Sequence, residues 1–237
     1  MCGCALSFRL SSSTVEHYPD GPFPILTSPA SQLWIDLEDG PQETTLACIN
    51  QRFPLATRLE LGISMRSLDW LDACLAALPD RGWPTVEAVR LMDGTDRYLP
   101  VSVIRHTARL SPGLTDICFE NAPLDLDELA AAFEGLAAVA PTLQALDFWV
   151  VEDAIEDESR PGSIQLAAEA LGHLSGLRRL TVMWDRETGP AGVLAPALRA
   201  LTSLSSLAVR GVAWREGAQP RQPLDERRGS LRELVLG

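Results

Sequence analysis

The amino-acid sequence predicts an α/β fold, namely a right-handed solenoid in which parallel strands form a concave sheet and helices form the convex side. Two observations support this prediction. An apolar pattern with gaps of three and two residues, L-x-x-L-x-L, recurs along the chain, and segments with helical periodicity lie between its copies. Strand followed by helix, repeated about every 28 residues, is the arrangement of a parallel right-handed solenoid.

The apolar pattern occurs seven times, and only Ala56, the first residue of the first copy, is a weak member. The last two apolar residues of each copy alternate with their neighbours, so they point to one face of a strand. Successive middle residues are separated by 30, 28, 29, 34, 27 and 27 residues. Seven strands are therefore predicted, each centred one residue after a middle position. The middle residues are Leu59, Val89, Ile117, Leu146, Leu180, Leu207 and Leu234.

A turn-prone residue precedes each copy of the pattern. Proline at four of these positions ends the preceding helix, because proline lacks an N–H group and disfavours helix at the residue before it. A strand can then begin. The turn-prone residues are Pro54, Pro84, Pro112, Pro141, Ser175, Ser203 and Gly229.

Three segments between the strands have the clearest helical pattern. Ser67 can cap the first of them. The second begins with Asp125, Asp127 and Glu128, and acidic residues stabilise the positive end of a helix dipole. The predicted helices span residues 67–78, 125–140 and 163–174.

These repeats resemble the leucine-rich-repeat family, in particular the long-repeat subclass typified by ribonuclease inhibitor and by F-box substrate receptors. The resemblance covers residues 43–237, and residues 48–61 are most similar to the F-box type. It implies a repeat array of about seven strands. One position departs from the family, which commonly has Asn or Cys three residues after the last leucine, so irregular turns are expected. This chain has Ser64, Gly94, Ala122, Val151, Asp185 and Val212 there.

Residues 1–42 lie outside the clear repeats and are rich in Ser, Pro and Gly, although residues 33–37 have the pattern of one divergent strand. No F-box helix triplet is found among them. The acidic residues between Val151 and Arg160 account for the one long interval and are interpreted as a solvated loop. The sequence stops inside a strand pattern, and because solenoids need polar caps, the repeat array is expected to be incomplete at its C-terminus.

The chain has 237 residues, a net charge of −12 and 46% hydrophobic residues, which is typical of a soluble folded protein and argues against a nucleic-acid partner. All 20 basic residues are arginine, which excludes a Schiff-base lysine and a phosphate-loop lysine. No secretory signal pattern or long apolar run is present, so no membrane partner is expected. Five scattered cysteines favour a reducing, cytoplasmic location.

No residues stand out with catalytic or metal-ligand spacing, so neither an enzymatic activity nor a cofactor nor a metal is expected. Cys2 and Cys4 could bind a metal or carry a lipid, but no second cysteine pair completes a metal site. Arg105 and Arg109 flank His106, which suggests an exposed convex helix face. The three histidines, which no spacing aligns, are His17, His106 and His173.

Side chains that alternate with the buried leucines are expected to project from the concave sheet. Met92, Trp149 and Met183 are large and apolar where a solvated sheet would carry small polar residues, which is typical of the centre of a protein interface. A neighbouring loop such as the acidic segment could instead cover Trp149. The residues expected to bind a partner are Glu60, Arg90, Met92, Glu120, Asp147, Trp149, Met183 and Arg210.

The expected function is that of a non-catalytic scaffold that binds a protein partner on the concave face. A substrate-receptor fragment of the F-box type is one form of this function. The alternatives are a regulatory or sensing domain detached from a larger enzyme or receptor, and an axonemal or cytoskeletal adaptor. An F-box encoded upstream would favour the receptor, whereas a nucleotide-binding or kinase signature would favour the regulatory domain.

Overall fold

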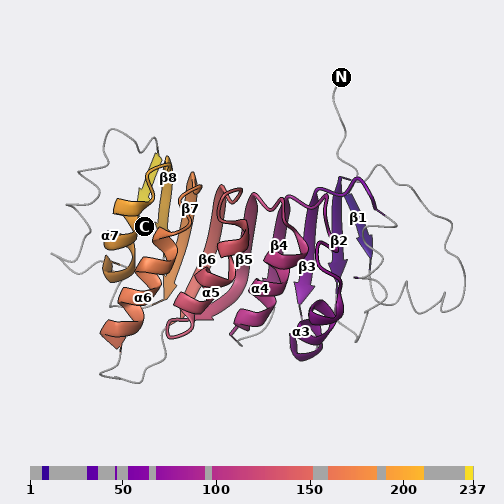
Figure 1. Ribbon diagram of the computed structural model, residues 1–237, viewed down its shortest axis with the longest axis horizontal. Helices are drawn as coiled ribbons and strands as arrows, with labels where there is room; N and C mark the ends of the chain where they lie inside the picture. Colours follow the sequence, from indigo (N-terminus) through magenta and orange to yellow (C-terminus); the bar gives the residue numbers. More distant parts are fainter. Residues whose placement is uncertain are drawn as a thin grey trace, which may run out of the picture. The chain divides into compact units, whose positions relative to one another are not determined.

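The computed structural model describes residues 7–10, 31–36, 46, 53–63, 68–93, 98–151, 160–185, 191–210 and 233–236. The chain divides into two compact units, Met1–Ala122 and Pro123–Gly237. In both units parallel strands alternate with helices (Figure 1), which confirms the predicted α/β class and the predicted parallel pairing of strands.

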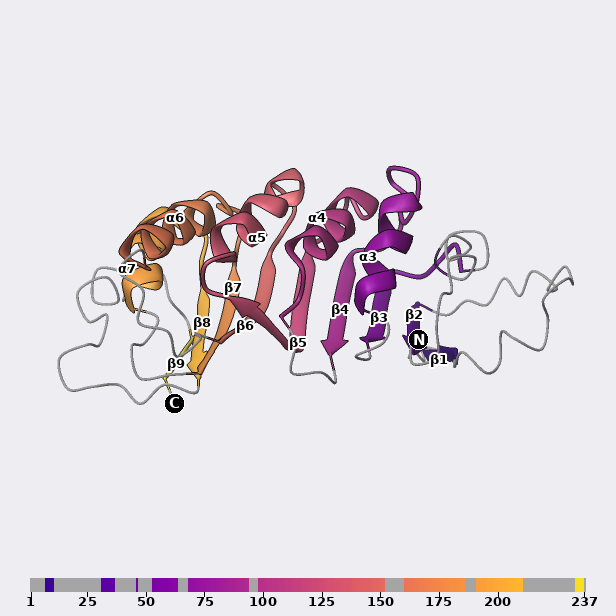
Figure 2. The ribbon, with the colours of Figure 1, turned by 90° about the horizontal axis from the view of Figure 1, so that it is seen from below.

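The first unit begins with two strands and continues with alternating strands and helices. Its elements are β1 (Ser7–Leu10), β2 (Gln32–Asp36), β3 (Arg58–Ile63), α3 (Leu68–Ala77), β4 (Ala88–Asp93), α4 (Val101–Leu110) and β5 (Asp116–Asp125), whose last residues belong to the second unit. The strands pair in chain order, and every pair runs parallel. Figure 2 shows α3 and α4 on one face of these strands, and no described helix of this unit lies on the other face.

The second unit repeats this layered arrangement. Its elements are α5 (Leu129–Gly135), the 3-10 helix η1 (Ala137–Val139), β6 (Ala145–Val151), α6 (Arg160–Gly172), β7 (Arg179–Asp185), α7 (Ala191–Ala200), β8 (Ser206–Arg210) and β9 (Glu233–Leu236). Strands β6 to β9 pair in chain order and run parallel. Helices α5, α6 and α7 cover one face of this sheet (Figure 2).

The strand register follows the predicted repeat. All seven predicted strands are present, and the middle residues of the apolar pattern lie opposite one another within each unit. In the first unit the register row is Leu33, Leu59, Val89 and Ile117. In the second unit it is Leu146, Leu180, Leu207 and Leu234. The segment with a divergent strand pattern forms β2, and β1 is a further strand that the repeat pattern does not indicate.

A tight turn precedes the strands where the sequence places turn-prone residues. The N–H of Val86 donates to the carbonyl of Trp83 (3.2 Å) around Pro84, and an equivalent hydrogen bond closes the turns at Pro54 and Pro112. Proline suits this position because its fixed φ matches the first central residue of a type I turn. The prolines therefore end one repeat and set the start of the next strand.

One carbonyl oxygen in each repeat of the first unit holds the beginning of the next strand. The carbonyl of Thr57 accepts the N–H groups of Glu87 (2.8 Å) and Ala88 (2.9 Å), and the carbonyl of Glu87 accepts those of Thr115 (2.7 Å) and Asp116 (3.1 Å). The hydroxyl of Thr115 also donates to the carbonyl of Glu87 at 3.1 Å. These bonds fix the alignment of consecutive repeats.

The hydrophobic core of each unit lies between its sheet and its helices. In the second unit Phe133 of α5 packs edge-on against Phe148 of β6, with ring centroids 5.2 Å apart and an interplanar angle of 73°. Leu146 is buried in the same core. In the first unit the buried Trp83 donates its indole N–H to the carbonyl of Leu46 at 3.2 Å. Removing this apolar surface from water is the main stabilising contribution to such a fold.

Two of the three predicted helices are present with shifted ends, as α3 and α6, whereas the helix predicted over residues 125–140 is shorter and interrupted. β5 continues to Asp125, and the N–H of Asp127 donates to a carboxylate oxygen of Asp125 (3.1 Å), which forms a turn in place of a helix start. α5 begins only at Leu129, and Leu126 within the turn is buried. Local acidic residues therefore stabilise a turn here, not the first turn of the helix.

Candidate partner-binding face

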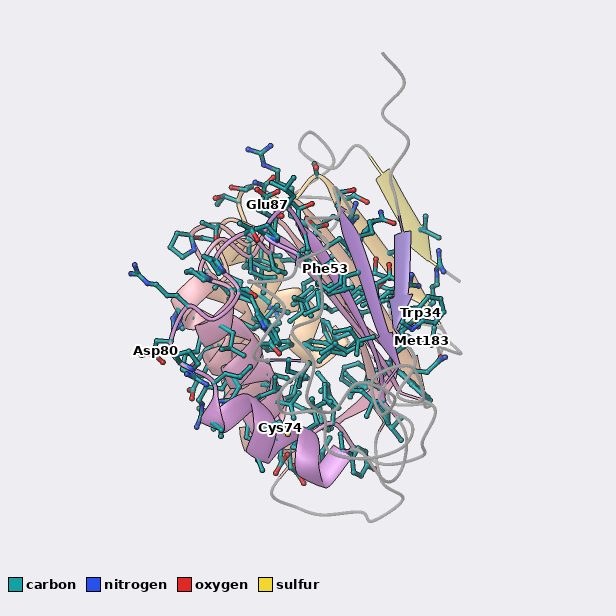
Figure 3. All side chains as sticks on the ribbon, turned by 90° about the vertical axis from the view of Figure 1, so that its right-hand side faces the viewer. Trp34, Phe53, Cys74, Asp80, Glu87 and Met183 are labelled. Carbon is teal, nitrogen blue, oxygen red and sulfur yellow. The ribbon has the colours of Figure 1, made fainter. Side chains whose placement is uncertain are left out.

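We call the face of each sheet that no described helix of its unit covers the open face. Along β3 the side chains of Leu59, Leu61 and Ile63 are buried, whereas Glu60 between them is half-buried. This alternation places Glu60 on the open face, because successive side chains of a strand point to opposite sides. Figure 3 shows Trp34 on the other side of the strands from Cys74 and Asp80, which lie on the helix side of the same unit.

The open face of the first unit carries charged side chains on three neighbouring strands. Arg90 forms an ion pair with Glu120, and both side chains are about two-fifths exposed. Arg90 lies opposite Glu60 in the register, and Glu120 lies opposite Met92. An ion pair this exposed contributes only about 0–1 kcal/mol to folding, so its main effect is to hold the two side chains in place.

The open face of the second unit combines apolar and charged side chains. Trp149, Met183 and Arg210 occupy one register row across β6, β7 and β8. Met183 is 42% exposed and Arg210 is exposed, whereas Trp149 is half-buried. The neighbouring register row consists of Asp147, Thr181, Ala208 and Val235.

All the residues expected from the sequence to bind a partner lie on strands, at positions that alternate with buried residues. Glu60, Arg90, Met92 and Glu120 are on the open face of the first unit. Asp147, Trp149, Met183 and Arg210 are on the open face of the second unit.

Two further large side chains on the open faces were not among the expected binding residues. Trp34 of β2 is half-buried and lies opposite Glu60 in the register. Val235 of β9 is 38% exposed. The alternation in residues 33–35 and 234–236 gives the signal that identifies them, because both residues lie between two apolar ones.

Trp184 belongs to the core and not to the open face. It lies opposite Val150 in the register and is 2% exposed. Its indole N–H and that of Trp149 are covered, and neither has a hydrogen-bond acceptor within the part of the chain that the structure describes. A covered N–H without an acceptor costs about 1–3 kcal/mol, which offsets part of the free energy gained by burying the two rings.

His106 differs from the exposed residue that its neighbours suggest, because it is half-buried beside α3. Its Nε2 atom lies 3.6 Å from Oδ1 of Asp72 on α3. Burial lowers the pKa of His106; Asp72 raises it in part, and Arg109 and Arg105 lower it further. The imidazole is therefore mainly neutral at pH 7.

Several residues singled out in the sequence lie outside the described part of the chain. They are Cys2, Cys4, His17, Ser64, Ser67, Gly94, Val212, Gly229 and the acidic residues within 152–159. Among the residues that the structure does describe, no group of three His, Cys, Asp or Glu is placed to hold a metal ion. Nor does that part of the chain include a helix of the length and apolarity needed to cross a membrane.

No known family model and no curated protein matches the sequence.

Proposed function

We propose that the chain is a curved, right-handed leucine-rich-repeat solenoid that acts in the cytoplasm as a protein-binding scaffold without catalytic activity. Its open faces form the concave side of this solenoid and bind the partner. The residues that contact the partner are Glu60, Arg90, Met92, Glu120, Asp147, Trp149, Met183 and Arg210.

The observation that carries this proposal is the row of Trp149, Met183 and Arg210 on the open face of the second unit. Trp, Met and Arg are enriched at protein interfaces, and Trp and Arg often contribute most of the binding energy. A row of such residues on a face without a helix of its unit is typical of a binding surface. The strand register supports the leucine-rich-repeat interpretation, since it aligns residues 25 to 34 positions apart.

The experiment starts with affinity purification from source cells, followed by reconstitution with each identified protein in pure form. We expect Trp149→Ala to weaken binding by about 2 kcal/mol or more, as truncation of an interface anchor does. Met183→Ala removes a more exposed side chain from the same row and should also weaken binding, with less effect on folding. Binding would be measured by calorimetry and folding by thermal unfolding.

The control is Arg105→Ala, which truncates an exposed side chain on α4 on the helix side. This variant should bind as the unmodified chain does. If both open-face variants keep full affinity and a stable fold, the open face of the second unit is not the binding surface and the proposal fails.

A further inference from the structure

The row of Trp149, Met183 and Arg210, which we call the apolar–arginine row, has two parts of different chemistry. Met183, labelled in Figure 3, presents an exposed thioether beside the half-buried ring of Trp149. Arg210 lies one strand further along and is exposed, and its guanidinium forms no ion pair with any residue that the structure describes. An apolar surface is thus followed directly by a positive charge that pairs with no described residue.

The charge of the row specifies the kind of group that it can bind. A guanidinium binds a carboxylate through two parallel N–H···O hydrogen bonds, a geometry that lysine cannot provide. On the strands around Arg210, Asp185 follows Met183 by two positions on β7, and Glu233 on β9 lies opposite Ser206 of β8. Asp147 and Arg179 lie further from Arg210 in the register, and both take part in interactions. Because Arg210 forms no ion pair with a described residue, its guanidinium can take a carboxylate of the partner.

The spacing of the row matches that of an extended peptide. Neighbouring strands lie about 4.8 Å apart, so the point midway between Trp149 and Met183 is about 7 Å from Arg210. In an extended chain, side chains two residues apart point to the same side and are about 6.6–6.8 Å apart. One peptide can therefore place an apolar side chain on Trp149 and Met183 and a carboxylate on Arg210.

We propose that the apolar–arginine row binds an extended segment of the partner in which a large apolar residue and an Asp or Glu are separated by one residue, in either chain direction. This inference rests on the proposed function, because it names what the open face of the second unit recognises. It adds a sequence requirement that a general protein-binding scaffold does not have.

The test uses a displayed library of random 12-residue peptides, selected separately on the unmodified chain and on Arg210→Glu. We expect the unmodified chain to enrich peptides with the apolar-x-acid spacing. Arg210→Glu should enrich peptides in which the acid is replaced by Arg or Lys, because the charge on the row is reversed. Affinities would then be measured with synthetic versions of the selected peptides. An acidic peptide should bind Arg210→Glu, and a basic peptide the unmodified chain, about tenfold or more weakly than its matched chain, which corresponds to about 1.4 kcal/mol.

Arg105→Glu is the matched control, since it reverses an exposed arginine on the helix side. It should select the same peptides as the unmodified chain, and thermal unfolding should show that all variants fold. The inference is wrong if the unmodified chain enriches no peptide, or if Arg210→Glu enriches the same peptides as the unmodified chain. This holds even when binding of the reconstituted partner still depends on Trp149. If the partner does not depend on Trp149 or Met183, the proposed function itself has failed.

Discussion

Arg109 shows how a single side chain connects two repeats. Its Nη1 atom donates to the carbonyl of Leu78 (2.8 Å) and to Oδ1 of Asp80 (2.7 Å), and its Nη2 atom donates to the carbonyl of Leu75 (2.6 Å). Carbonyls at the end of a helix lack partners within the helix, and a planar guanidinium can serve two of them at once. Arg109 of α4 thereby caps the C-terminal end of α3, whereas Arg105 on the same helix is exposed.

His106 makes the stability of the chain depend on pH. Burial holds its pKa below the ordinary value of about 6.5, so the unfolded chain binds a proton more readily than the folded one. The stabilising contribution is complete above pH 6.5 and is lost as the pH falls below that value. We expect the free energy of unfolding to decrease as the pH is lowered from 7 to 5, measured by urea unfolding.

The contribution of His106 can be isolated with two variants. His106→Gln should reduce this pH dependence, because the variant has no group that titrates at this position. Asp72→Asn should lower the pKa of His106 further, which proton NMR of the imidazole would show, since the carboxylate of Asp72 is the group that favours the charged form. An unchanged pKa in Asp72→Asn would contradict the contact between α3 and α4.

Buried and exposed leucines should differ in their contribution to the free energy of unfolding. Leu146 of β6 is 1% exposed, and Leu146→Ala should destabilise by about 2–5 kcal/mol because it opens a cavity in the core. Leu166 of α6 is 58% exposed, and Leu166→Ala should change stability by no more than about 0.5 kcal/mol. Urea unfolding measures both, and equal losses would mean that the register of β6 is wrong.

At the scale of elements, the turns before the strands set the distance between repeats. The N–H of Leu177 donates to the carbonyl of Leu174 (3.0 Å) across Gly176, and the N–H of Leu114 donates to the carbonyl of Ser111 (3.0 Å) across Gly113. The two glycines occupy equivalent turn positions, and neither has a positive φ. Their surroundings nevertheless differ.

A β-carbon at Gly176 would lie 2.9 Å from the carbonyl oxygen of Ala140 and 3.0 Å from that of Leu143, whereas one at Gly113 would meet nothing within 4 Å. Gly176→Ala should therefore destabilise by about 1–3 kcal/mol, because the backbone of the preceding repeat must move. Gly113→Ala should be neutral or stabilise by up to about 1 kcal/mol, since it only restricts the unfolded chain. Thermal unfolding of the two variants tests whether the turn at Gly176 is in direct contact with the preceding repeat. Similar effects of Gly176→Ala and Gly113→Ala would exclude this contact.

At the scale of the whole molecule, the charge is strongly unbalanced. The chain carries 32 acidic and 20 basic residues, so its net charge is −12, and the excess negative charges repel one another. Raising the NaCl concentration from about 10 mM to 150 mM shortens the screening length from about 30 Å to 8 Å. We expect the melting temperature to rise by about 2–4 °C, which corresponds to about 1 kcal/mol for a chain of this size.

Arg105→Glu should enlarge this response to salt, because it makes the net charge more negative by two units at an exposed position on α4. Differential scanning calorimetry at the two salt concentrations measures the effect. A melting temperature that falls on addition of NaCl would show that attractive ion pairs, of which Arg90 with Glu120 is one, outweigh the net repulsion.

The sequence alone determined where the strands of the apolar pattern lie and which of their side chains face the core. Apolar residues at period two between turn-prone residues are a local signal, so Leu59, Val89 and their equivalents could be placed in register without coordinates, and the side chains between them could be assigned to the open face. The eight expected binding residues follow from the same alternation. The signal was absent at Ser7–Leu10, where only pairing with β2 defines the strand.

Only the tertiary structure decided the features that depend on residues distant in sequence. Arg109 caps a helix more than 30 positions earlier, and Asp72 meets His106 only because α3 and α4 pack side by side. β5 continues to Asp125, past Asn121 with a φ of 53° in the left-handed region that Asn tolerates, so α5 begins later than the acidic residues predict. Periodicity reports which face a side chain takes within its own element, whereas capping, burial of charge and the ends of elements depend on which neighbour the fold brings next to it.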